Sequence, residues 1–245
     1  MQYLGADCAL FVVRFERDVC TISADSSGEL LHRRGYRLAT AKAPLRETLA
    51  AGVLAAMRWD GREPLVDPMC GAGTIAIEAA LLARRMAPGL ARAFSCERWP
   101  NAPAGDFEAL RTAALAAARP RAPVPILASD RDAGAIAAAR TNAERAGVHG
   151  DITFRTCALA DLHPPPGPGL LLTNPPYGAR VGGRDDLRNL YAQLGKVARE
   201  RCPGWSLAFL SADRALEAQV KLPLAQVLRF QNGGIPVRLV AGRVP

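Results

Sequence analysis

The sequence predicts an α/β protein with a mostly parallel, doubly wound sheet. Short apolar runs of strand length alternate along the chain with segments whose apolar residues have helical spacing. The chain has 245 residues, 49% of them hydrophobic, which suits one large domain with a sizeable core and is too short for two independent enzymes. These observations exclude general disorder and predict a folded α/β domain.

The alternation consists of six expected strands and four expected helices. The strands are expected at 64–66, 124–128, 152–156, 170–173, 207–210 and 237–240, and the helices at 74–85, 132–146, 186–200 and 213–220. Residues 86–123, with their own helix at 107–117, and the proline-rich loop 163–169 interrupt the rhythm. Ligands bind beyond the carboxyl ends of the strands in such sheets, so the residues just after each strand are the candidate site.

The N-terminal part has a different pattern. The runs 9–15 and 19–24 predict a hairpin, and a helix is expected at 44–58 with Pro44 suited to its first turn. We therefore expect residues 1–42 to form a β-hairpin appendage with a basic linker, and residues 43–245 to form the main domain. The basic segment 31–37 is either a solvated loop or a strip that contacts phosphates, and both interpretations stay open.

Charge and composition limit the possible partners and location. The net charge is +8 and the sequence pI is about 9.6, as expected of a protein that meets polyanions such as nucleic acid. No apolar run approaches about 18 residues and the N-terminus lacks a basic flank, so we expect a cytoplasmic protein with no membrane contact. The six cysteines lack two-residue spacing, so neither a metal site nor a disulfide framework is expected.

A glycine loop follows the first strand of the main domain. Gly71 and Gly73 allow the backbone to approach a ligand, and the carboxylate of Asp67 before them can accept hydrogen bonds from a cationic amine. Ala76 stands where a dinucleotide fingerprint has its third glycine, and no strand-end acid follows within about 20 residues, so a nicotinamide cofactor is disfavoured. A purely structural turn is the alternative.

Acidic residues follow the next two strands. Asp130 can bridge the two hydroxyls of a ribose, although it could instead cap a helix, a role that Asp132 fills equally well. Asp161 can accept a hydrogen bond from an adenine amine or can be a solvated loop acid. Together these acids suggest an adenosine ligand with a cationic tail.

The most specific motif is Asn174-Pro175-Pro176-Tyr177, after the strand at 170–173. The two prolines stop the strand and fix a rigid turn. The side-chain oxygen of Asn174 and the carbonyl of Pro175 can accept both hydrogens of a planar amine, while Tyr177 offers a face for stacking. This geometry orients the lone pair of an amine for reaction.

These motifs, taken in order, resemble the catalytic domain of the THUMP-associated RNA guanine-N2 methyltransferases, and most closely the bacterial 23S rRNA branch. The resemblance spans about residues 23–240. It implies a Rossmann-like class I methyltransferase fold, S-adenosyl-L-methionine as methyl donor, and a structured RNA substrate, ribosomal RNA in that branch. It is carried by six segments: 26–28, 31–37, 43–47, 67–74, 174–178 and 232–234.

The resemblance also implies roles for individual residues. The catalytic motif falls on Asn174, Pro175, Pro176 and Tyr177, with Asn174 also at the cofactor. The donor-binding positions are Pro44, Leu45, Asp67, Gly71, Ala72, Gly73, Asp130 and Asp161. Two positions depart from the family: Ala72 replaces a common serine, and Ala179 stands where glutamate is frequent.

Several alternatives remain. The same turn serves enzymes acting on adenine N6, cytosine N4 or a glutamine amide, whereas segments 34–37 and 232–234 favour guanine N2. A non-catalytic RNA-binding scaffold of the same fold is a further alternative. Residues 1–22 are too few for a THUMP domain, so we expect a separate RNA-binding partner to replace it.

Overall fold

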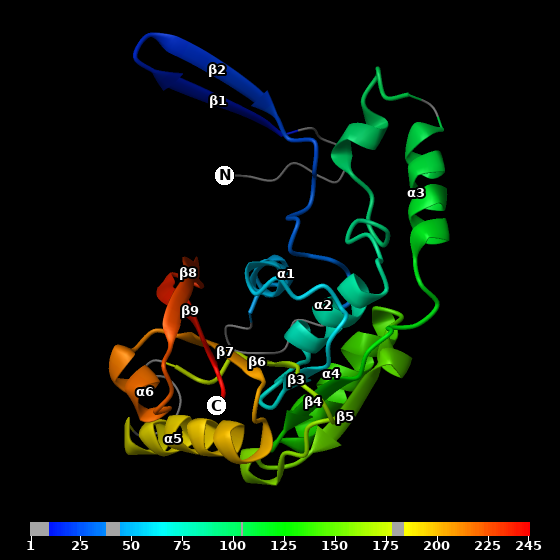
Figure 1. The fold of residues 1–245 in the computed structure, drawn as a ribbon. Helices are drawn as coiled ribbons and strands as arrows, with labels where there is room; N and C mark the ends of the chain where they lie inside the picture. The colour runs from blue at the N-terminus through cyan, green and yellow to red at the C-terminus, as the bar shows by residue number, and fades with distance from the viewer. Residues whose placement is uncertain (1–9, 38–44, 104, 178–183) are drawn as a thin grey trace.

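A computed structural model describes residues 10–37, 45–103, 105–177 and 184–245, and its main body is a seven-stranded sheet between two layers of helices (Figure 1). The strand order is β5-β4-β3-β6-β7-β9-β8. Strands β3 to β7 are parallel, and β9 is antiparallel to both β7 and β8. The predicted fold class is confirmed. The strands are β3 (Leu65–Asp67), β4 (Ile126–Asp130), β5 (Ile152–Thr156), β6 (Leu170–Thr173), β7 (Ser206–Ser211), β8 (Ala225–Asn232) and β9 (Ile235–Arg243).

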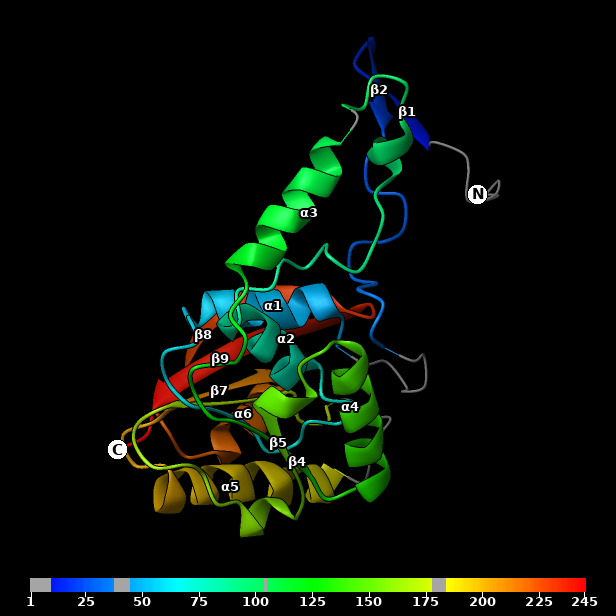
Figure 2. The ribbon, with the colours of Figure 1, turned by 90° about the vertical axis from the view of Figure 1, so that its right-hand side faces the viewer.

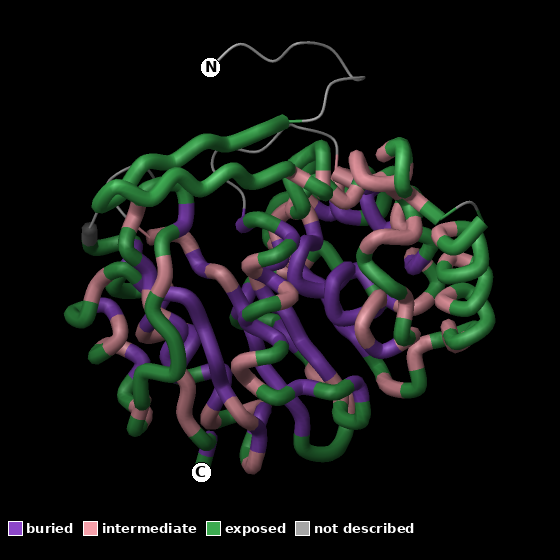
Figure 3. The backbone as a smooth tube through the Cα atoms, turned by 90° about the horizontal axis from the view of Figure 1, so that it is seen from above, coloured by how far each residue is buried: buried purple, intermediate pink, exposed green. Residues whose placement is uncertain are grey.

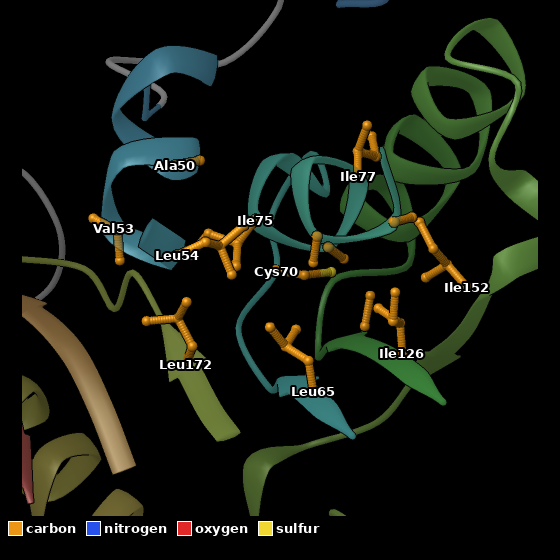
Figure 4. Close-up of a cluster of buried hydrophobic side chains, with 14 of the residues drawn as sticks. Ala50, Val53, Leu54, Leu65, Cys70, Ile75, Ile77, Ile126, Ile152 and Leu172 are labelled. Carbon is orange, nitrogen blue, oxygen red and sulfur yellow. The ribbon is translucent and has the colours of Figure 1, made fainter. Parts of the chain in front are cut away.

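Helices cover both faces of the sheet, as Figure 2 shows with α1 and α2 on one side and α5 on the other. Neighbouring strand residues face opposite layers: Leu65 packs with the α1, α2 and α4 side, and Val66 with the α5 and α6 side. Figure 4 shows the first of these cores. The helices are α1 (Glu47–Ala56), α2 (Thr74–Ala83), α4 (Ala133–Arg145), α5 (Arg184–Arg201) and α6 (Arg214–Gln219).

The N-terminal hairpin of β1 (Phe11–Glu16) and β2 (Val19–Ala24) projects away from the sheet. Every residue of both strands is exposed, in contrast to the buried central strands (Figure 3). The chain after the hairpin packs on the interrupting segment 86–123, whose helix α3 spans Asp106–Ala117. There the Arg92 guanidinium donates to the backbone carbonyls of Ser27 and Glu29.

Strand β8 is absent from the sequence-based prediction, which expected only the strand at 237–240 in this region. Residues 225–232 lack apolar alternation because β8 lies at the sheet edge, where its residues are mostly exposed and Val227 and Leu228 follow one another. A two-residue turn joins β8 to β9, with φ of 58° at Gly233 and 83° at Gly234, values that glycine adopts readily. None of the helices in the described ranges is long and apolar enough to cross a membrane.

Candidate active site

The glycine loop between β3 and α2 uses its two glycines differently. A Cβ atom on Gly73 would lie 2.9 Å from the Cβ of Ala139, so this glycine allows α2 to pack closely against α4. Apart from its chain neighbours, no atom of the described residues lies within 4 Å of a Cβ placed on Gly71, whose φ is 50°. The backbone is thus open on the Gly71 side, while the half-buried Ala72 is held through its carbonyl, which accepts from Asn142 Nδ2 at 3.0 Å.

Asp130 joins this loop to the end of the neighbouring strand β4. Its carboxylate accepts from the backbone N–H groups of Gly71 and Asp132, both at 3.0 Å. The helix cap is Asp132, whose carboxylate accepts from the Gly134 N–H at 2.7 Å. Asp130 is therefore available at the strand ends beside the open glycine and is not the residue that caps α4.

Asp67 lies beneath the same loop and is only 1% exposed. Its carboxylate accepts from the hydroxyl of Thr173 at 2.8 Å and from the Met69 N–H at 3.3 Å, which ties the end of β3 to the end of β6. Burial, opposed by the Thr173 hydrogen bond, raises the pKa of Asp67 to about 7. The glycine loop and the turn after β6 are thereby held together.

Replacing Asp67 by asparagine is expected to change the pH dependence of stability. The native carboxyl holds its proton up to about pH 7, whereas the same carboxyl in the unfolded chain releases it near pH 4. The stability that this proton contributes to the native state is therefore lost as the pH rises between these values. The free energy of unfolding of Asp67→Asn relative to wild type should rise from about pH 5 to 7, by at most about 1.4 kcal/mol per unit. Urea unfolding at several pH values measures this, and a constant difference would contradict it.

The other expected donor residues are more scattered. Leu45 is buried at the start of α1, and Pro44 lies outside the described residues. Asp161 is exposed in the short 3-10 helix Leu159–Asp161 after β5. Its carbonyl lies 2.7 Å from Nδ1 of His163, so this contact involves the backbone of Asp161 and not its carboxylate.

The turn at Asn174–Tyr177 follows β6, next to β3 in the sheet. The Oδ1 atom of Asn174 is buried and has no hydrogen-bond partner within the described part of the chain. The Pro176 carbonyl accepts from the Tyr191 hydroxyl on α5 at 3.5 Å, and Pro175 is buried. A buried acceptor without a donor is costly, so Asn174 presents an oxygen suited to an incoming N–H group.

Tyr177 is half-buried at the exit of the turn. Its hydroxyl oxygen accepts from Nδ2 of Asn232 at 2.9 Å, and burial raises the pKa of its phenol. The sequence includes Asn232 in the motif 232–234 but predicts no contact for its side chain. The two glycines that follow Asn232 are the signal in the sequence for a tight turn at this position.

The basic segment 31–37 is partly internal, and its residues Leu31, Arg33 and Gly35 remain exposed. Arg34 pairs with Glu78 at 2.7 Å, and the Tyr36 hydroxyl donates to the same carboxylate at 2.8 Å. Arg37 donates to the Leu45 carbonyl and to the hydroxyl of Thr74. Three of the segment's side chains are therefore internal, because a carboxylate buried in the apolar helix α2 needs partners.

Arg37 of this segment links two parts of the candidate site, a role that the sequence does not predict. Thr74 is the first residue of α2 after the glycine loop, and Leu45 belongs, with Pro44, to the segment expected at the donor. Arg37 holds the two together, and its Nε lies 3.5 Å from Glu47. Glu78, alone among apolar residues in TIAIEAALLA, was the available signal.

The sheet order, the glycine loop beside a strand-end acid, and the proline-rigidified turn define a methyltransferase of the Rossmann-like class. A family model described as "RMKL-like, methyltransferase domain" matches residues 34–240, and the chain belongs to this family. The resemblance stated from the sequence is thereby confirmed.

Relatives and solved structures agree with this assignment. The ribosomal RNA large subunit methyltransferase K/L of Shewanella sp. is 39% identical over 226 residues, covering 90% of this chain and 32% of the relative. The crystal structure of SMU.472, described as a methyltransferase in complex with S-adenosylhomocysteine, superposes with a TM-score of 0.88 at 28% identity. The match covers 97% of this chain and 62% of that one.

A solved structure from Listeria monocytogenes, described as a predicted N6-adenine-specific DNA methylase, superposes with a TM-score of 0.85 at 35% identity. The match covers 96% of this chain and 60% of that one. The chain spans about a third to three fifths of the length of the curated relatives that it matches first.

Proposed function

We propose that the chain transfers a methyl group from S-adenosyl-L-methionine to the exocyclic N2 amine of a guanine in structured RNA, specifically ribosomal RNA. The observation that carries the proposal is the buried, unpaired Oδ1 of Asn174, placed by β6 beside the β3 glycine loop. A similar solved structure crystallised with S-adenosylhomocysteine and a relative named for ribosomal RNA methylation support the donor and the substrate class.

The residues around the glycine loop fit the donor. Gly71 leaves open space over its backbone, and the Asp130 carboxylate beside it can accept from ribose hydroxyls. Asp161 follows the next strand, where it can accept from the adenine amine, and Leu45 contributes an apolar wall. When bound, S-adenosylmethionine supplies an electrophilic methyl group on a sulfonium.

The turn supplies the acceptors for the reacting amine. Asn174 Oδ1 and the Pro175 carbonyl accept its two N–H groups, which directs the nitrogen lone pair at the methyl carbon. Tyr177 offers its half-buried ring as a stacking surface for the base. Because N2 of a paired guanine is packed in the minor groove, the base must lie in a loop or be flipped out before it reaches Tyr177.

Selection of the RNA target is proposed to need an RNA-binding domain or partner beyond these residues. Arg34 and Arg37, which could have contacted phosphates, are engaged in internal ion pairs with Glu78 and Glu47. The remaining positive charge gives salt-sensitive attraction to RNA but carries no sequence information.

Replacing Asp130 by alanine is expected to weaken S-adenosylmethionine binding by about 1–3 kcal/mol, because ribose hydroxyls and the Gly71 N–H lose their acceptor. Isothermal titration calorimetry measures this loss. The matched control is Asp132→Ala, which removes the α4 cap and should cost about 0.5–2 kcal/mol of stability while leaving donor affinity unchanged. Equal donor affinity in Asp130→Ala and wild type would remove Asp130 from the donor site.

Adenine N6 is the second candidate acceptor, since a 35% identical solved structure carries an adenine-methylase designation. Incubation with labelled donor and separate RNA, DNA and protein fractions, then digestion and mass spectrometry, decides between the candidates. The expected product is N2-methylguanosine in ribosomal RNA. Label in N6-methyladenine or in methylglutamine would overturn the guanine assignment while leaving the donor assignment intact.

A further inference from the structure

The β8–β9 hairpin extends past the end of the parallel sheet on the side of the candidate active site. The last residue of β7, Ser211, pairs with Arg238 of β9, so the three β9 residues before Arg238 continue beyond β7. Their β8 partners, Phe230 to Asn232, extend equally far. The tip of this hairpin therefore extends past the carboxyl ends of the parallel strands, the edge of the sheet at which the glycine loop follows β3 and the Asn174–Tyr177 turn follows β6.

Asn232 is fixed at this tip. It pairs with Ile235 across the Gly233-Gly234 turn and is only 7% exposed. Its Nδ2 donates to the Tyr177 hydroxyl at 2.9 Å, joining residues 55 positions apart. Within the described ranges, and leaving out chain neighbours, no atom lies within 4 Å of a Cβ placed on either glycine, so the turn borders open space next to a buried contact.

We propose that Asn232 is a positioning residue that holds the Tyr177 ring at the amine-accepting turn, and that the tip of the β8–β9 hairpin forms one wall of the base pocket. The inference rests on the proposed function, in which Tyr177 stacks on the target base. The backbone of Tyr177 is set by Pro175 and Pro176, but its ring can still rotate. A hydrogen bond from a rigid hairpin to the end of the ring removes that freedom before the base arrives.

A double-mutant cycle tests this role. Asn232→Ala should lower kcat by about tenfold or more with unchanged donor affinity, because the ring loses its fixed orientation. In a Tyr177→Phe background, which lacks the acceptor oxygen, the same change should lower kcat by less than about threefold. The control Gln226→Ala, at an exposed position near the start of β8 and away from the hairpin tip, should resemble wild type.

The inference fails if Asn232→Ala lowers kcat by the same factor in both backgrounds, or if it weakens donor binding as much as it lowers kcat. Should Asn232→Ala not fold, Tyr177→Phe alone removes the same hydrogen bond from the other side. It should then reproduce the fall in kcat, and wild-type turnover in that variant would overturn the inference.

A measurement without substrate separates this inference from the proposed function. With 3-fluorotyrosine at the four tyrosines, the ¹⁹F resonance missing from Tyr177→Phe belongs to Tyr177. Asn232→Ala should shift and sharpen that resonance, and Gln226→Ala should leave it in place. An unmoved resonance in an active enzyme overturns the inference alone. If Asn232→Ala shifts the resonance but the wild-type chain methylates none of the fractions, the proposed function is overturned, and with it the role of Asn232 in turnover.

Discussion

Replacing Asn174 by alanine is expected to lower kcat by about a hundredfold or more while leaving S-adenosylmethionine affinity nearly unchanged. The buried Oδ1 is an acceptor without a donor in the described structure, so its removal costs the ground state little. The loss falls on the transition state, where the amine must keep its lone pair directed at the methyl carbon. Single-turnover rates with ribosomal RNA, together with calorimetry of donor binding, measure the two effects separately.

The matched control is Asn189→Ala, an exposed asparagine on α5 that should leave both quantities unchanged. Asn174→Asp keeps the acceptor but introduces a charge into a buried position, and we expect it to be intermediate in kcat. An Asn174→Ala variant that loses donor affinity as strongly as it loses turnover would show that the side chain serves the donor and not the amine.

Replacing Glu78 by alanine is expected to lower the free energy of unfolding by about 3–5 kcal/mol, the cost of leaving a buried charge unpaired. Glu78 has 1% of its side chain exposed and Arg34 has 11%, and the Tyr36 hydroxyl would lose its acceptor as well. Burial raises the pKa of Glu78 to about 7, and the Arg34 guanidinium opposes that rise. Urea unfolding at neutral pH gives the magnitude.

Glu144→Ala, on the exposed side of α4, serves as the control and should change stability by less than about 0.5 kcal/mol. Glu78→Gln keeps an acceptor for Tyr36 but removes the charge opposite Arg34. Its loss in the free energy of unfolding should therefore lie between those of Glu78→Ala and Glu144→Ala. A loss below about 1 kcal/mol in Glu78→Ala would mean that the basic segment is held by its backbone and not by this carboxylate.

The parallel part of the sheet could be predicted because its central strands are buried on both faces and are separated by helices with clear apolar spacing. Strand β6, for example, is LLLT and is entirely buried. Strand β8 could not be predicted from its pattern, because an edge strand packs few side chains and leaves no periodic signal. Its position emerges only from pairing with β9.

The same distinction applies to the candidate site. Residues after adjacent parallel strands must meet at one edge, so the proximity of Asp130 to Gly71 follows from the predicted topology. The contact between Asn232 and Tyr177 and the pairing of the basic segment with Glu78 do not. Asn232 donates to the Tyr177 hydroxyl across 55 positions, and the Tyr36 hydroxyl donates to Glu78 across 42 positions. Both contacts depend on how the edge hairpin and the basic segment pack against the rest of the fold.

The overhanging β8–β9 hairpin has a consequence for how the site is completed during synthesis. The residues of the candidate site are spread from Leu45 to Asn232, and the hairpin tip is made after all the others. At a synthesis rate of about 5–20 residues per second, roughly 10–40 s separate the first of these residues from the last. In the later part of that interval, once β4 and then Tyr177 have been made, a nascent chain can assemble the donor loop on β3 and β4 while the ring of Tyr177 still lacks the strand that holds it.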